Sequence, residues 1–276
     1  MSFLIAWNFP VRLAFKCLMT TMLMFYFMLC VALAADATPV DVGRRDHSEL
    51  SQIITSASLL DKPGDRIAAI SSHFLDSPYA AGILTGGPQE KEQLVINLAA
   101  FDCFTFLDVV EALRRASNAD DFPAQLQQVR YRDGKVAYTH RRHFFSDWVA
   151  DGTLISDVTA EVGRGRAEIS GKQLNRRSDG TDWLPGIAVT PRNIHYLPTS
   201  GIDAELLSGL QSGDYVGIYS ELAGLDVSHT GLIVKSNGTT MLRHASSRSG
   251  VERVVDEELL TYLQGKPGLL VYRVNP

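Results

Sequence analysis

An α+β fold is the class that the sequence predicts, and three observations lead to it. Apolar residues recur at helical spacing within residues 46–76 and again after Cys103. Four segments beyond residue 213 instead have the length and composition of strands. The pair Asn237-Gly238 separates two of these segments by the two residues of a type I′ hairpin. This order of elements favours helices packed on an antiparallel sheet.

Two helices are expected within residues 46–76. Asp46 and Glu49 form a capping-box pattern before the first helix, and Pro63 suits the first turn of the second. Their apolar stripes comprise Leu50, Ile53, Ile54 and Leu60, then Ile67, Ile70 and Phe74. We expect residues 35–276 to form a single domain, with residues 35–90 as a small helical N-terminal addition that ends in a loop over residues 77–90.

The next helix is expected to begin at Cys103. Asp102 is a natural N-cap, and Leu107, Val110 and Leu113 follow at helical spacing. A cysteine in the first turn of a helix lies near free N–H groups and the positive end of the helix dipole, which favour its thiolate. The alternative is a buried cysteine that only fills space.

The remaining segments are assigned by their local patterns. A hairpin is expected to turn at Asp133-Gly134, and residues 163–200 are expected to be irregular. The expected helices cover residues 123–129 and 204–210, and the expected strands cover residues 94–98, 214–220, 228–235, 239–246 and 269–274.

Residues 1–34 have the pattern of a secretory signal peptide. The basic residues Arg12 and Lys16 precede an apolar run over residues 17–32. Ala32-Leu33-Ala34 is a small-residue cleavage site. The mature protein is therefore expected to begin at Ala35, to be periplasmic or secreted, and to have no stable membrane span. A retained membrane anchor is the alternative.

Charge and cysteine content limit the possible partners. Without residues 1–34 the chain has 242 of its 276 residues, with 24 basic and 31 acidic side chains and a net charge of −7. No dense basic patch occurs, so nucleic acid is not an expected partner. Of the three cysteines only Cys103 remains, which excludes an internal disulfide. A single thiol in an oxidising compartment is expected to be buried or used.

The hairpin at Asn237-Gly238 predicts that two histidines meet. If Ser236 pairs with Thr239, His244 lies opposite Gly231 and becomes a diagonal neighbour of His229 on one face, roughly 7–8 Å away. Their imidazoles then reach one small site.

A cysteine at a helix start and histidines from a sheet are the groups that nucleophilic acyl transfer needs. The thiolate attacks a carbonyl, one imidazole transfers the proton, and a second polar group orients that imidazole. The expected roles are nucleophile for Cys103, base for His229 and orienting residue for His244. A zinc site with these three ligands is the rival, but the chain contains neither CxxC nor HExxH.

These residues resemble those of the NlpC-type papain-like cell-wall hydrolases, in particular the N-acetylmuramoyl-L-alanine amidase-like branch. The resemblance runs from about Leu94 to Val274. Two departures are Phe104, where a small hydroxylic residue is commoner, and residues 169–187, which do not follow the family pattern. The segments that carry the resemblance are Phe101-Asp102-Cys103, Val129-Arg130-Tyr131-Arg132-Asp133-Gly134, His143-Phe144-Phe145-Ser146-Asp147-Trp148, Ser156-Asp157-Val158-Thr159, Gly213-Asp214, residues 224–233 and Leu242-Arg243-His244-Ala245-Ser246-Ser247.

The resemblance implies a papain-like catalytic core over residues 91–276, in which the Cys103 helix packs on an antiparallel sheet. It implies a monomeric cysteine amidase without metal or cofactor, whose substrate is peptidoglycan or a muropeptide and which cleaves between the lactyl group of N-acetylmuramic acid and L-alanine. One alternative is an endopeptidase that cuts after γ-D-glutamate. Another is a non-catalytic muropeptide-binding protein that kept the fold.

The polar and aromatic segment 139–148 is expected to form a wall of the substrate cleft. Because muropeptides carry carboxylates, its cationic side chains are candidates to pair with them. The alternative is a local hydrogen-bonded turn of His143 and Asp147 under Trp148. The residues assigned to substrate binding are Asp102, Arg141, His143, Ser146, Asp147 and Ser228, and Arg142 is a further candidate to pair with carboxylates.

Overall fold

The computed structural model describes residues 40–41, 46–150, 152 and 155–275. The chain divides into two compact units, Met1–Thr38 and Pro39–Pro276. The predicted signal segment and its cleavage site lie outside the described residues. In the part of the chain that is described, no helix has the length and apolar character needed to cross a membrane.

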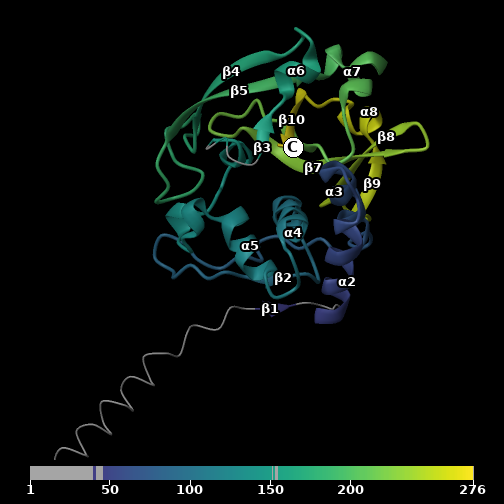
Figure 1. The fold of residues 1–276 in the computed structure, drawn as a ribbon. Coiled ribbons are helices and arrows are strands. Elements are labelled where there is room, and N and C mark those ends of the chain that lie inside the picture. Colours follow the sequence, from purple (N-terminus) through teal and green to yellow (C-terminus); the bar gives the residue numbers. More distant parts are fainter. Residues whose placement is uncertain (1–39, 42–45, 151, 153–154, 276) are drawn as a thin grey trace, which may run out of the picture. The chain divides into compact units, whose positions relative to one another are not determined.

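The second unit is built around one antiparallel sheet in the order β4-β5-β10-β6-β7-β8-β9, with β3 paired to β10 (Figure 1). A separate short pair joins β1 (Val40–Asp41) to β2 (Ile96–Asn97) in parallel. The strands of the main sheet are β3 (Ile155–Asp157), β4 (Glu168–Leu174), β5 (Thr190–Pro198), β6 (Tyr215–Tyr219), β7 (Val227–Ser236), β8 (Thr239–Ala245), β9 (Val254–Glu258) and β10 (Gly268–Val274).

Helices cover both faces of this sheet. The first group comprises α2 (His47–Ser58), α3 (Pro63–Ser72), α4 (Cys103–Arg115) and α5 (Phe122–Arg130). The second comprises the short helices α6 (Thr159–Gly163), α7 (Ala204–Gly209) and α8 (Leu259–Leu263). Short 3₁₀ turns are η1 (Arg132–Gly134), η2 (Tyr138–His140), η3 (Phe145–Trp148) and η4 (Thr199–Gly201).

Strand β6 shows how the two faces are divided. Its alternate residues Tyr215 and Tyr219 pack into the cluster that contains α2 to α5, whereas Val216 and Ile218 pack with α6, α7 and α8. All five residues of this strand are buried. Burying each large apolar side chain contributes about 1.5–3 kcal/mol, so both layers stabilise the central strands. The predicted α+β class is thus confirmed.

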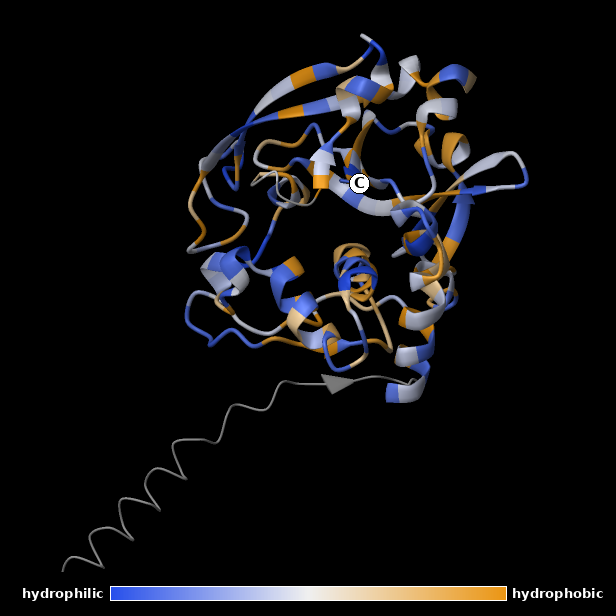
Figure 2. Ribbon diagram, in the orientation of Figure 1, coloured by the Kyte–Doolittle hydropathy of each residue, from blue (hydrophilic) through white to orange (hydrophobic). Residues whose placement is uncertain are grey.

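Helix α4 begins at Cys103, as predicted. Asp102 accepts hydrogen bonds from the N–H groups of Phe104 and Thr105, at 3.0 and 2.7 Å. The Thr105 hydroxyl in turn accepts from the Asp102 N–H, which completes a capping box. The apolar side of α4 is buried, and the hydropathy colours of Figure 2 show this helix with both hydrophobic and hydrophilic residues. The cap therefore fixes the residue at which the helix starts.

The helices of residues 46–76 are also confirmed, with Asp46 capping α2 and Pro63 in the first turn of α3. Leu60 differs from its prediction, because it follows the end of α2 and is 37% exposed. Side chains of α2 and α3 belong to the same core as α4. This shared core makes the N-terminal helices part of the packed body.

Two segments were predicted wrongly. Asp133 and Gly134 do adopt positive φ, but Tyr131 bridges to Arg141 and the expected hairpin is replaced by 3₁₀ turns. Residues 163–200 contain the antiparallel pair β4–β5 instead of irregular structure. Most of β4 is exposed and most of β5 is only partly buried, so the sequence lacks a clear apolar alternation there.

Smaller differences concern element number and length. The strand expected at residues 94–98 shortens to Ile96–Asn97 and lies outside the main sheet. The elements β1, β3, α6, β9 and α8 were not predicted. Because β9 and α8 flank the hairpin that carries the histidines, their positions matter for the site.

Candidate active site

Cys103 is placed by the first turn of α4 against strand β7. The Thr230 hydroxyl donates a hydrogen bond of 2.9 Å to the Cys103 carbonyl, and Thr230 directly follows His229 in the strand. Phe104, the next residue of α4, packs on Phe145 and Trp148 with ring centroids 6.3 and 5.7 Å apart. The large side chain at this position is therefore explained by packing.

The surroundings of the thiol differ from the expectation. Burial and the neighbouring Asp102 carboxylate raise the pKa of the Cys103 thiol. Hydrogen bonds from Thr230 and from the Cys103 N–H lower this pKa, but by less than burial and Asp102 raise it. Desolvation and a nearby negative charge thus outweigh the helix dipole, and the resting residue is a neutral thiol.

The two histidines meet as the hairpin register predicts. Strands β7 and β8 pair from Ser236↔Thr239 to Leu232↔Arg243, which is the predicted register. His229 Nε2 lies 2.7 Å from His244 Nδ1. Gly231 allows this contact, because a Cβ there would lie 2.7 Å from Leu242 and 3.0 Å from the His244 Cβ.

A carboxylate completes the row of hydrogen bonds. His244 Nε2 lies 2.9 Å from Glu257 Oε2, and the other oxygen of Glu257 accepts from Arg248 at 2.5 Å. Glu257 comes from β9, which is paired to β8 in antiparallel register. The site therefore draws on three consecutive strands and on the start of α4.

These contacts fix where the protons lie. Burial lowers the pKa of His244. Burial, with the neighbouring His244 and Lys266, lowers the pKa of His229 to about 3. Both imidazoles are therefore neutral at neutral pH. A carboxylate accepts, so His244 donates from Nε2 and accepts at Nδ1. His229 consequently donates from Nε2 and keeps the lone pair of Nδ1 available as a base.

A cavity of about 550 Å³ adjoins the histidines. Tyr262 of α8 lies against both rings, with centroid distances of 6.0 Å to His229 and 4.9 Å to His244. Burial and the charge of Glu257 raise the pKa of Tyr262 to about 12, so its hydroxyl keeps its proton. Other residues that line the cavity are Ile218, Ser228, Ser246, Ser247, Arg248, Glu257, Thr261, Gln264 and Lys266.

In the described part of the chain, no hydrogen bond joins the Cys103 sulfur to the His229 ring; the thiol is hydrogen-bonded to Thr230. Catalytic hydrogen bonds are often long in unliganded enzymes and tighten in the complex with substrate. The roles of Cys103, His229 and His244 therefore remain predictions that the arrangement supports.

The segment 139–148 uses its polar groups within the protein. Arg141 pairs with the buried Glu92, at 2.5 Å, and His143 Nε2 lies 2.8 Å from the Tyr138 carbonyl. Arg142 donates to carbonyls at the end of α5, those of Gln128, Val129 and Tyr131. The alternative of a local turn of His143 and Asp147 is met only in part, because Asp147 accepts from the Phe144 N–H whereas His143 bonds to Tyr138.

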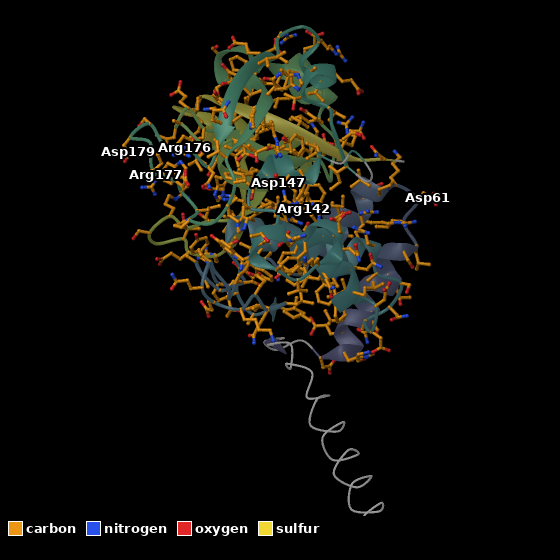
Figure 3. The ribbon with its side chains drawn as sticks, turned by 90° about the vertical axis from the view of Figure 1, so that its left-hand side faces the viewer. Asp61, Arg142, Asp147, Arg176, Arg177 and Asp179 are labelled. Carbon is orange, nitrogen blue, oxygen red and sulfur yellow. The ribbon has the colours of Figure 1, made fainter. Side chains whose placement is uncertain are left out.

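Ser146 and Asp147 are likewise engaged by neighbours. Arg192 donates to the Ser146 hydroxyl at 2.9 Å and to Asp147 at 2.8 Å, and the Ser146 N–H donates to Asp226. In Figure 3, Asp147 and Arg142 lie near the middle of the view, and Arg176, Arg177 and Asp179 lie together at its left edge. Arg141, His143 and Asp147 do line a separate cavity of about 200 Å³, so their substrate role stays a prediction.

The other two predicted binding residues differ in position. Asp102 uses one carboxylate oxygen to accept from Phe104, Thr105 and the Thr105 hydroxyl, as an N-cap does. Ser228 lines the same cavity as His229 and His244. Ser228 is thus the predicted binding residue that the structure brings to the histidines.

Sequence reasoning missed the residues on or next to β9 and α8, namely Arg248 before β9, Glu257 in β9, Tyr262 in α8 and Lys266 in the turn after α8. A signal existed in Ser249-Gly250, a turn pair between Ala245 and the apolar pair Val254-Val255. Reading it as a hairpin places a β9 strand beside the His244 strand. Glu257 would then have been a candidate partner of the histidines.

The zinc alternative finds little support in this geometry. The imidazoles use facing nitrogens to bind one another, so their lone pairs do not converge on one point. Among residues 46–150, 152 and 155–275, no group of three or more His, Cys, Asp or Glu side chains is arranged to hold a metal ion.

The chain matches the model of a known family. The model of the AmiA-like family, described as N-acetylmuramoyl-L-alanine amidase-like, matches residues 69–269. That range includes Cys103, His229, His244 and Glu257. A search of curated proteins finds no match.

Solved structures with the same fold exist. The chain is similar to an N-acetylmuramoyl-L-alanine amidase from Bacteroides uniformis ATCC 8492, at 26% identity and a TM-score of 0.66 over 78% of this chain and 100% of that one. It is also similar to a putative xylanase from Bacteroides fragilis. The identity is 30% and the TM-score is 0.61, over 74% of this chain and 98% of that one. The chain is similar to a Legionella pneumophila protein at 22% identity, with a TM-score of 0.69 over 83% of this chain and 94% of that one. This likeness supports the fold alone.

Proposed function

Because the chain belongs to the N-acetylmuramoyl-L-alanine amidase-like family, we propose that it is a cysteine hydrolase that cleaves the amide between N-acetylmuramic acid and L-alanine. The single observation that carries the proposal is the hydrogen-bonded row of His229, His244 and Glu257 beside a cavity and next to the residue that binds Cys103. The proposal includes the papain-like, NlpC-type character of the core.

The first step is attack by sulfur on the lactyl carbonyl. The resting thiol is neutral, so His229 Nδ1 takes its proton as the S–C bond forms. His244 accepts from His229 Nε2–H, and Glu257 stabilises the positive charge that then develops on the imidazole pair. His229 gives the proton to the nitrogen of L-alanine as the C–N bond breaks, which leaves a muramoyl thioester.

The second step is hydrolysis of the thioester. A water molecule loses a proton to His229 as it attacks the carbonyl, and the sulfur leaves and regains that proton. The first N–H groups of a helix have no intrahelical acceptor. Asp102 occupies those of Phe104 and Thr105. We therefore assign oxyanion binding to the Cys103 N–H, which in the resting enzyme faces its own thiol.

The relative described as a putative xylanase raises glycoside hydrolysis as a second reaction. Most glycosidases need two carboxyl groups about 5–9 Å apart across the scissile bond. Among the described residues that line this cavity, the one carboxylate is Glu257, and it is bound by His244 and Arg248. The residues that line the cavity therefore favour amide hydrolysis over glycoside hydrolysis.

The test is mass spectrometry of products from defined muropeptides. The expected products are free N-acetylmuramic acid and the intact stem peptide, with none formed by Cys103→Ala. A cut after γ-D-glutamate would assign the protein to the endopeptidases instead. Tight binding without turnover would support a muropeptide-binding protein.

Export to the periplasm or medium and a monomeric state complete the proposal. Export rests on the apolar run and the Ala32-Leu33-Ala34 site in the sequence. A signal peptide would bring the enzyme to the compartment where peptidoglycan lies.

A further inference from the structure

One cation beside the histidines has no acidic partner. Lys266 lines the cavity with His229 and His244, and among the described residues no carboxylate pairs with its ammonium group. Its Nζ lies 5.8 Å from the centre of the Tyr262 ring, which is in turn 6.0 Å from the His229 ring. Tyr262 thus neighbours both the lysine and the histidine at the cavity wall.

The backbone holds Lys266 in this place. Its N–H donates to the Leu263 carbonyl at 2.9 Å, which closes the turn after α8. Gly265 before it has φ of 71°, a left-handed conformation that glycine adopts without strain. Pro267 after it accepts from the Thr199 N–H. The anchor of the side chain is therefore fixed, although its ammonium group is exposed.

The charge of the cavity is positive in an acidic protein. The chain has a formal net charge of −5. Glu257 pairs with Arg248 at 2.5 Å and balances its charge, so the positive charge of Lys266 is not balanced by that pair. The cation also contributes to lowering the pKa of His229, so its field reaches the base. An anionic group of a substrate is the natural partner for such a charge.

The cavity adjoins the proposed base and not the thiol. His229 and His244 line it, whereas Cys103 does not. The imidazole that returns the proton must face the departing nitrogen, so the leaving group extends from the thiol past His229. In the proposed reaction the leaving group is the stem peptide, which starts with L-alanine. Its second residue, γ-linked D-glutamate, carries a free α-carboxylate about two residue lengths, roughly 7 Å, from the scissile nitrogen.

We propose that Lys266 binds the α-carboxylate of the second stem residue and makes the enzyme selective for an acidic leaving peptide. This inference rests on the proposed function and deepens it. Tyr262 neighbours both the base and the cation, so its ring can pack on the alanine methyl group. The lysine thus sets specificity without touching the reacting atoms.

The test compares two substrates that differ in one group. They are N-acetylmuramoyl-L-alanyl-D-glutamate and its α-carboxamide, N-acetylmuramoyl-L-alanyl-D-isoglutamine. The wild type should prefer the acid by about tenfold in kcat/KM, the size of one partly exposed charge-assisted hydrogen bond. Lys266→Gln should lose this preference, because its kcat/KM should fall for the acid and stay unchanged for the amide. Lys266→Arg should keep most of the preference.

Lys135→Gln is the matched control, because this exposed lysine follows η1 and does not line the cavity. It should keep the wild-type preference. Equal rates on acid and amide in the wild type, or an equal loss on both in Lys266→Gln, would overturn the carboxylate site and leave the amidase proposal standing.

Binding to the Cys103→Ala variant separates the two proposals. Calorimetry should show that this variant binds the acid more tightly than the amide, and that adding Lys266→Gln abolishes the difference. If the wild type cuts neither compound but this pattern of binding is found, the carboxylate site stands and the amidase proposal fails. If the variant binds both equally, the carboxylate site is refuted.

Discussion

His229 Nε2 lies 2.7 Å from His244 Nδ1, and the planes of the two rings meet at 88°. This relationship decides which nitrogen of His229 can act as a base. The carboxylate of Glu257 holds the proton of His244 on Nε2, so the His244 lone pair faces His229. The His229 proton is thereby held on Nε2, and Nδ1 is left for the thiol.

The first prediction concerns the nucleophile. Cys103→Ala should abolish release of the stem peptide, because no other group can form the thioester. Cys103→Ser should be nearly inactive, since a hydroxyl is far less acidic than a thiol. The free energy of unfolding should change by only about 1 kcal/mol, because a small side chain is removed. Chromatography of products and thermal denaturation measure both; substantial activity in the alanine variant would refute the covalent mechanism.

The second prediction ranks the histidines. His229→Ala should lower kcat by roughly 10²–10⁴-fold, the contribution of a general acid–base group. His244→Gln should lose less, because its amide oxygen can still accept from His229 and its NH₂ can still donate to Glu257. Initial rates on one muropeptide give the comparison. A greater loss in His244→Gln than in His229→Ala would reverse the assigned roles.

Glu257 gives the third prediction, which concerns a positioning residue. Glu257→Gln should lower kcat by about tenfold with KM little changed, because a neutral amide stabilises the developing imidazolium less than a carboxylate does. The variant protein should remain folded. Glu252→Gln, which changes an exposed carboxylate that does not line the cavity, is the control. If KM rises while kcat is unchanged, Glu257 contacts the substrate instead.

The fourth prediction concerns export. Protein recovered from the periplasm or medium should begin at Ala35, because Ala32-Leu33-Ala34 is the expected cleavage site. N-terminal sequencing of the recovered material is the measurement. Detection of residues 1–34 on the exported protein would show that the segment is retained as an anchor.

Much of the site could be predicted from local patterns. Asp102 before an apolar helical stripe predicted the start of α4, and Asn237-Gly238 predicted the register that joins His229 to His244. Both signals act over a few residues, so the sequence shows them directly. They sufficed to predict α4 and the histidine pair.

What could not be predicted depends on distant contacts. Glu257 reaches His244 only because β9 returns beside β8, and its strand contains three consecutive acidic residues that resemble a solvated segment. The helix-start position of Cys103 suggested a stabilised thiolate, but burial reversed the direction of the shift. The ion pair of Arg141 with Glu92, which lies 49 residues earlier, was not predicted. Burial and pairing of this kind are set by the tertiary structure.

The last prediction concerns stability against pH. Burial lowers the pKa of His229 from its ordinary value of 6.5 to about 3 and lowers that of His244 too. Below pH 6.5 the unfolded chain therefore takes up protons that the folded chain does not. The linkage relation then requires the free energy of unfolding to fall as the pH falls from about 6.5 toward 3.

His229→Gln removes one of these groups while it keeps a polar side chain in the cavity wall. Between pH 7 and pH 4.5, its melting temperature should fall less than that of the wild type, because Gln binds no proton in either state. His47→Gln, at an exposed histidine of α2, should follow the wild type. Differential scanning calorimetry at matched ionic strength makes the comparison. Parallel losses in the wild type and His229→Gln would mean that His229 is charged in the folded protein, and the proton arrangement assigned to the row would then be wrong.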